Sequence, residues 1–282
     1  MLMKLLKEVT QQELNKLPAN PQSKQNVERM EAMEKRISKY FLNLRKSYPY
    51  DLVYSRLYYK YITILESISD ELIEADALPK DFITETDALI IPIIASYKSQ
   101  FNEIMTTSYY DSFIDAAKEI RTYFRYVKDI WKMRNYTISY DALPVEDAAK
   151  YAEQNAAKLI TKIDEVTRER IRNTIAKSIK NRETLAQLEK TIFDEFTDMS
   201  KARAKLIART ETAKAIEHGG FNEAKALGLQ EKSIILGPNP CIICVGNESR
   251  GWIPIDQSFD EGDYPSFHPN CVCCTIYRYV KK

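Results

Sequence analysis

The absence of glycine from the first 218 residues is the feature that most constrains how this chain folds. All seven glycines of the 282-residue sequence lie at Gly219 or beyond it. Glycine supplies the positive-φ conformations of tight turns and weakens helices, so a long stretch without it favours helices joined by short links. The sequence therefore predicts a mainly α-helical protein whose turn-rich part is confined to its C-terminal end.

Composition and charge exclude several broad classes of protein. Hydrophobic residues make up 44% and charged residues 29%, which argues against a wholly disordered chain. The 41 Lys and Arg balance the 40 Asp and Glu, so attraction of the whole chain to nucleic acid is not expected. The balance does not exclude a basic face on one part of the surface. The longest apolar run, Ala88–Ala95, is far short of the roughly 20 residues of a spanning helix, so we expect no membrane association. Met1–Glu8 is too short and too polar for a signal peptide, so we expect synthesis in a reducing cytoplasm.

Apolar residues that recur at spacings of three and four predict the helices. The ranges with this pattern are 27–44, 52–73, 109–133 and 149–179. Pro79 and Pro92 are expected to interrupt the segment that follows the second range, and Pro144 suits a helix start. Residues 135–143 are predicted to form a short extended link.

Capping residues predict where the helices after residue 180 begin and end. Thr184 and Gln187 have the spacing of a capping box, which predicts a helix from there to about Phe196. Ser200 is expected to cap a long last helix over 201–227, which Gly228 would end.

All five cysteines lie in the C-terminal tail, in a metal-ligand pattern. Two residues separate Cys241 from Cys244, and after 23 further residues His268 and Cys271 repeat that spacing, with Cys273 beyond. Such a gap lets two ligands face one tetrahedral ion, and a second pair closes the site. Thiolate and imidazole favour zinc over magnesium or calcium. A tail of about fifty residues holds little core unaided, so we predict a structural zinc.

The choice of four ligands is open. The simplest set is Cys241, Cys244, His268 and Cys271. If residues 271–273 form a strand, Cys271 and Cys273 share a face, so Cys273 would replace one ligand while Cys274 points away. The alternative to a metal site is that the thiols are small buried hydrophobic groups and that His268 satisfies a turn.

Acidic residues between the two ligand pairs raise the alternative of a zinc-dependent nuclease. They are Asp256, Asp260, Glu261 and Asp263. One of them could act as a general base, but four protein ligands fill a zinc shell, and acidic groups beside glycine and proline are typical of solvated turns. His218, the other histidine, is expected to cap carbonyls or face solvent. We therefore expect no enzyme.

Tyrosines lie among basic residues in 54–61 and 121–126. Such side chains stack on nucleic-acid bases in some proteins, but they also line helix contacts while Arg and Lys reach outward. The balanced net charge favours helix packing.

Two motifs carry a resemblance to a known family. One is Ile207-Ala-Arg209-Thr210-Glu211 within the run 201–215, and the other is His268-Pro-Asn-Cys271-Val-Cys273, about sixty residues later. Together with the cysteine pair, they resemble the Mu F-like phage head-morphogenesis family, over residues 136–277. Val272 stands where arginine is usual in that family, and Cys274 is additional.

The resemblance implies a minor head (capsid) protein of a tailed phage with no enzymatic activity. It would be a portal-associated virion component that acts in procapsid assembly and in genome packaging or ejection. The implied partners are the portal protein, with scaffolding protein, major capsid protein and packaged double-stranded DNA as further candidates. The implied location is the capsid interior or the portal vertex, after synthesis in the host cytoplasm.

The long helix of the first motif offers three candidate binding residues, Arg203, Arg209 and Glu211. Arg209 and Glu211 are two positions apart and cannot face each other on a helix, so each is expected to pair with another element. Internal salt bridges that fix the tail on the helical body are favoured over contacts to portal or DNA.

These observations predict a mainly α fold, an elongated multi-helix body with a small, zinc-stapled, turn-rich α+β subdomain at the C-terminus. The predicted regions are an N-terminal helical region (1–135), a helical Mu F-like core (136–230) and a Cys/His zinc-binding tail (231–282).

Overall fold

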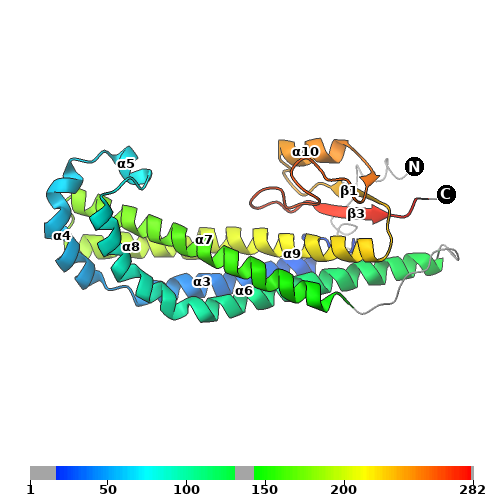
Figure 1. The fold of residues 1–282 in the computed structure, drawn as a ribbon, viewed down its shortest axis with the longest axis horizontal. Coiled ribbons are helices and arrows are strands. Elements are labelled where there is room, and N and C mark those ends of the chain that lie inside the picture. The colour runs from blue at the N-terminus through cyan, green and yellow to red at the C-terminus, as the bar shows by residue number, and fades with distance from the viewer. Residues whose placement is uncertain (1–16, 131–142, 281–282) are drawn as a thin grey trace. The chain divides into compact units, whose positions relative to one another are not determined.

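A computed structural model describes residues 17–130 and 143–280. These residues form a mainly helical protein with a small antiparallel sheet near the C-terminus, which confirms the predicted fold class at that level (Figure 1). The elements are α3 (Lys24–Lys46), α4 (Tyr50–Glu66), α5 (Asp70–Glu74), α6 (Lys80–Ile130), α7 (Val145–Lys180), α8 (Leu185–Asp198), the π-helix η2 (Met199–Arg203), α9 (Ala204–Ala226), β1 (Glu231–Ile235), α10 (Ile242–Ser249), β2 (Ile253–Pro254) and β3 (Cys274–Arg278). Within the described ranges, no helix is both long and apolar enough to cross a membrane.

The described residues divide into two compact units, each built from separate stretches of chain. The first unit takes the residues up to Glu34, Met105–Asn155 and the chain from Lys205 onward. The second unit takes Lys35–Ile104 and Ala156–Ala204. The division into 1–135, 136–230 and 231–282 stays a prediction.

Two of the predicted helix ends are confirmed. Thr184 and Gln187 form the capping box, in which the Gln187 N–H donates to Thr184 Oγ1 at 3.4 Å and the Thr184 N–H donates to Gln187 Oε1 at 2.8 Å. The end of α9 is set by Gly228, whose φ of +72° suits glycine. There the Leu229 N–H reaches back to the Ala224 carbonyl at 3.1 Å.

Two predictions about helix interruptions are wrong. The single helix over 52–73 is two helices, because Ser69 caps α5 by accepting the Leu72 N–H and separates it from α4. Pro92 does not interrupt the helix, because α6 continues through it. A proline removes one helical hydrogen bond, and burial of its neighbours Ile90 and Ile94 in the second unit offsets that loss.

Ser200 does not cap the last helix as predicted. It lies inside η2, which joins α8 to α9 without a break, and its hydroxyl donates to the Thr197 carbonyl at 2.8 Å. A π-turn adds a residue to the helix while keeping its backbone bonded, so no cap is needed there.

Some predictions fall on residues outside the described ranges. The predicted helix over 109–133 lies within α6 as far as Ile130, and its last residues are not described. The same holds for Met1–Glu8 and for the extended link over 135–143 up to residue 142.

The C-terminal sheet packs on α9 in the first unit. Its strand order is β2-β1-β3, and β1 pairs antiparallel with β3 from Glu231 opposite Arg278 to Ile235 opposite Cys274. Ile216 and Ala224 of α9 are buried in one cluster with Tyr277 of β3. The α9 helix is therefore the platform that positions the residues just before β3.

A bidentate ion pair and a close backbone approach fix α9 against α6 within the same unit. Arg121 donates to both carboxylate oxygens of the fully buried Glu223, at 2.5 and 3.0 Å. At Gly219 the helices come so close that a Cβ atom there would lie 2.3 Å from the Phe113 carbonyl oxygen.

We expect Gly219→Ala to destabilise the first unit by about 1–3 kcal/mol or more, because its Cβ overlaps backbone that cannot move aside. Gly246→Ala is the matched control, since a Cβ at Gly246 meets nothing within 4 Å. Urea unfolding followed by circular dichroism measures both variants. Equal unfolding midpoints for Gly219→Ala and the unsubstituted chain would contradict the packing described here.

Candidate metal centre

The start of α10 positions the first two cysteines. Cys241 is the N-cap of this helix in an extended conformation, and its sulfur accepts the N–H of Cys244 at 3.5 Å. The sequence Cys-Ile-Ile-Cys thus turns both sulfurs to one side.

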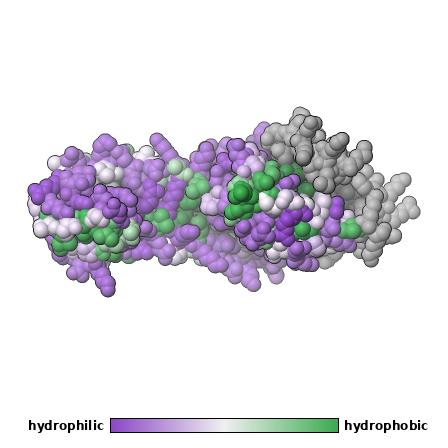
Figure 2. All heavy atoms as spheres, turned by 90° about the horizontal axis from the view of Figure 1, so that it is seen from above, coloured by the Kyte–Doolittle hydropathy of each residue, from purple (hydrophilic) through white to green (hydrophobic). Residues whose placement is uncertain are grey.

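The outer face of α10 is apolar. Ile242 is 88% exposed, and Ile243 and Val245 are also exposed. Figure 2 shows hydrophobic side chains on the surface seen from above, the side on which α10 lies in Figure 1.

The loop before β3 supplies the remaining donors. Its His268 Nδ1 lies 2.9 Å from the Pro269 carbonyl oxygen, which can only accept, so Nδ1 carries the proton and Nε2 keeps a free lone pair. The loop is anchored to α9, because the Asn270 N–H donates to Thr210 Oγ1 at 2.9 Å. The histidine is therefore held in the tautomer that a metal ligand needs.

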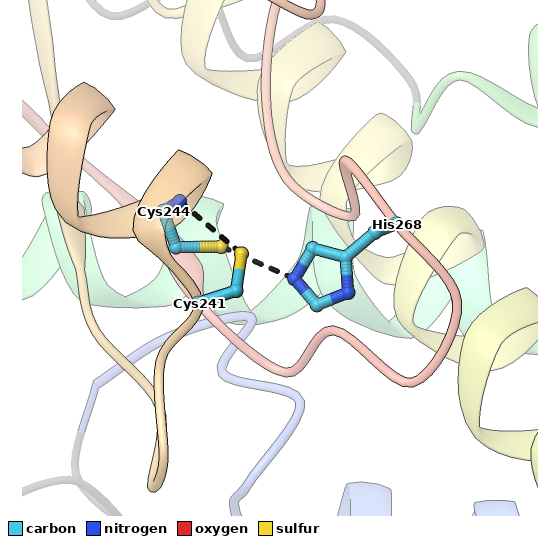
Figure 3. A group of neighbouring side chains, drawn as sticks. All are labelled: Cys241, Cys244 and His268. Carbon is cyan, nitrogen blue, oxygen red and sulfur yellow. Dashed lines mark hydrogen bonds between the residues drawn. The ribbon is translucent and has the colours of Figure 1, made fainter.

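The donor atoms converge on the sulfur of Cys244, which lies 3.4 Å from His268 Nε2 and 3.6 Å from the sulfur of Cys271. Figure 3 shows the sulfurs of Cys241 and Cys244 and the imidazole of His268 pointing toward one another. The donors of Cys241, Cys244 and His268 all lie within 4.8 Å of one another, as do those of Cys244, Cys271 and Cys273. These two groups could each hold a metal ion, and they share Cys244.

The distances fit a tetrahedral ion. Zinc bonds of about 2.3 Å to sulfur and about 2.0 Å to nitrogen place two sulfurs about 3.8 Å apart and a sulfur and a nitrogen about 3.5 Å apart. The observed separations of 3.6 and 3.4 Å around Cys244 are close to these values. The sulfur of Cys244 and its two neighbours His268 Nε2 and Cys271 Sγ are therefore already spaced as ligands of such an ion, whereas the two donor groups would have to draw together around it to give four ligands.

The crowded sulfurs also favour a cation electrostatically. Burial raises the pKa of the Cys244 thiol, and a hydrogen bond with Cys271 together with burial raises the pKa of Cys273. The same hydrogen bond from Cys273 lowers the pKa of Cys271. Ile234, Ile253 and Phe259 line this cluster. In such an apolar setting several thiolates can coexist only when a cation balances their charge.

Cys273 and Cys274 have different surroundings. Residues 271–273 precede β3, which begins at Cys274, so the strand alternation considered for Cys271 and Cys273 does not apply. The Cys273 sulfur accepts the Gly237 N–H at 3.2 Å and stays beside the cluster. Cys274 is buried and lies in neither donor group of the described residues.

The acidic residues considered for a nuclease are engaged in local contacts. Asp256 pairs with Lys225 at 2.8 Å and Asp260 with Arg250 at 3.0 Å. Glu261 accepts a hydrogen bond from Asn247, and Asp263 accepts one from Ser258. Among the described residues, neither donor group includes a carboxylate.

His218 neither caps carbonyls nor faces solvent, so that prediction is wrong. Its ring stacks on Tyr151 at 4.4 Å between centroids, and its two nitrogens meet the Tyr264 hydroxyl and the Asn222 amide. Burial lowers the pKa of His218, which favours the neutral ring. No local pattern indicates Tyr151 and Tyr264 as its neighbours, because both are distant from His218 in the chain.

The three candidate binding residues have separate surroundings. In the second unit, Arg203 donates to Thr167 Oγ1 at 3.2 Å, and burial lowers its pKa to about 10. In the first unit, Glu211 accepts the Tyr109 hydroxyl at 2.6 Å and pairs with Lys214 of its own helix at 3.0 Å. The Nε of Arg209 is buried without a hydrogen-bond partner. No carboxylate of the described residues lies within ion-pair distance of Arg203 or Arg209.

Two residues that support the metal loop were not predicted from the sequence. Thr210 anchors Asn270, and its place in the Ile207–Glu211 motif was the available signal. Gln22 donates from Nε2 to the Val272 carbonyl at 2.9 Å, across 250 positions of sequence. Nothing in the sequence around Gln22 indicates that contact.

Comparison with known proteins supports the resemblance seen in the sequence. Residues 169–276 match the family model described as phage Mu protein F like protein, which confirms the predicted resemblance to that family over this segment. The matched segment contains the three candidate binding residues and the whole Cys/His cluster. No curated protein and no solved structure matches the chain.

We expect Cys244→Ser to abolish metal binding, because Cys244 belongs to both donor groups. Elemental analysis of the purified full chain by mass spectrometry measures the metal content and identifies the element. Cys274→Ser is the matched control and should keep the metal content of the unsubstituted chain. Full metal content in Cys244→Ser, or equal loss in both variants, would contradict the site described here.

Proposed function

From the match of residues 169–276 to the Mu F-like family, we propose that the chain is a minor head protein of a tailed phage. The observation that carries this proposal is that the matched segment holds both the Ile207–Glu211 motif and the Cys/His cluster that packs beside it. In this role the protein acts in procapsid assembly and in genome packaging or ejection.

The metal of the cluster is zinc, and its role is structural. Three thiolates and one imidazole are a donor set that zinc prefers, and Cys241, Cys244, His268 and Cys271 are the ligands. Bound zinc supplies a cross-link between the start of α10 and the loop before β3. The chain's own contacts hold that loop in register, since Thr210 binds the Asn270 N–H and Gln22 binds the Val272 carbonyl.

The protein acts without catalysis. A zinc ion with four protein ligands has no open position for water, whereas a catalytic zinc keeps one. The nearby Asp256 and Asp260 are paired with Lys225 and Arg250, so neither is positioned as a free general base. Metal-dependent cleavage of DNA by the purified chain would instead favour the nuclease alternative.

The portal protein is the principal partner, and the protein occupies the capsid interior or the portal vertex. Scaffolding protein, major capsid protein and packaged DNA are further candidates for contact. Support comes from the family match and from two arginines, Arg203 and Arg209, that have no ion-pair partner among the described residues.

We expect a few to a dozen copies of this chain in each DNA-filled particle, counted by quantitative mass spectrometry against portal and major capsid protein. Cys271→Ser should lower this number, because loss of a zinc ligand loosens the tail. Cys274→Ser should leave it unchanged. Absence of the unsubstituted chain from particles would contradict the head-protein assignment, and full occupancy by Cys271→Ser would contradict the role of zinc.

A further inference from the structure

A groove in the first unit lies beside the metal loop and has charged walls. It encloses about 340 Å³ between the first turns of α3, the start of α9 and the loop before β3. Lys205 and Arg209 of α9 contribute the basic wall, and Glu31 and Glu34 of α3 contribute the acidic wall. Met30 and Val272 contribute apolar surface.

Arg209 is held in this groove without a partner. Its Nε is buried and makes no hydrogen bond, and no ion pair to Arg209 exists in the described part of the chain. A guanidinium has five N–H donors arranged to meet a carboxylate in a planar fork. Because the Nε is closed off from solvent, an acidic group that entered the groove would meet the terminal nitrogens of the guanidinium.

The remaining charges of the groove are also unpaired. Among the described residues, Lys205, Glu31 and Glu34 make no ion pair, and the opposite walls do not pair with each other. By contrast, Arg29 on the same helix α3 forms an ion pair with Asp115 at 2.5 Å. The groove therefore presents two walls of opposite charge, both available to a third molecule.

We propose that this groove binds an extended segment of a protein partner. The segment carries an acidic residue that meets Arg209 and Lys205, an apolar residue that packs on Met30 and Val272, and a basic residue that meets Glu31 and Glu34. The acidic wall disfavours a DNA backbone, because Glu31 and Glu34 would repel its phosphates. The partner is a head protein, which rests on the function proposed above.

The groove depends on the metal loop. Val272 lies between Cys271 and Cys273, and Pro238 of the same groove is three residues before Cys241. Gln22, which also lines the groove, binds the Val272 carbonyl. Loss of the metal would loosen the segments on either side of this wall, so binding of the partner segment should weaken when the metal is removed.

An array of overlapping peptides that tile the other virion proteins of the same phage tests this inference. The probe is the full-length, metal-loaded chain, and affinities for the bound peptides are then measured by fluorescence polarisation. Peptides with an acidic, an apolar and a basic residue should bind, and Arg209→Gln should weaken them at least about tenfold, the loss expected for a charge-assisted hydrogen bond. Lys205→Gln and Glu31→Gln, both at exposed positions, should each weaken the same peptides.

Arg56→Gln, at an exposed position in the second unit, is the matched control and should bind as the unsubstituted chain does. Removal of the metal with a chelator should reduce binding, and its return should restore it. The inference is overturned if no peptide depends on Arg209, or if the groove variants change affinity for double-stranded DNA instead. Absence of the chain from particles, with Arg209-dependent peptide binding retained, would contradict the proposed function alone.

Discussion

The convergence of donor atoms on the Cys244 sulfur is the constraint on which the C-terminal part of the structure depends. His268 Nε2 and the Cys271 sulfur lie 3.4 and 3.6 Å from it, inside an apolar cluster. Several thiolates in such surroundings repel one another unless a cation is present. The proposed zinc would remove that repulsion and would join α10 to the loop before β3, two segments that the small sheet alone would hold weakly.

The helix α9 connects this centre to the rest of the first unit. Successive residues of a helix point about 100° apart, so three consecutive residues of the α9 motif face three different parts of the unit. Arg209 lines the groove, Thr210 anchors the metal loop, and Glu211 accepts a hydrogen bond from Tyr109 of α6. One short motif thus organises a proposed binding surface, a metal-loop anchor and a helix contact.

Local signals in the sequence predicted much of this, and long-range contacts account for the rest. The capping box at Thr184 and the glycine at Gly228 were predictable because caps depend on a few adjacent residues. The spacing of the cysteines singled out residues that the structure brings together. Pro92 was misjudged because burial around α6 overrides the local cost of proline, and the contact of Gln22 with Val272 depends on packing that no local pattern encodes.

X-ray absorption at the zinc edge of the purified, metal-loaded full chain would identify the ligands around Cys244. Ligation by Cys241, Cys244, His268 and Cys271 should give three sulfurs at about 2.3 Å and one nitrogen at about 2.0 Å. A shell of four sulfurs would replace His268 with Cys273 and contradict the ligand set. A shell rich in oxygen would contradict a closed structural centre.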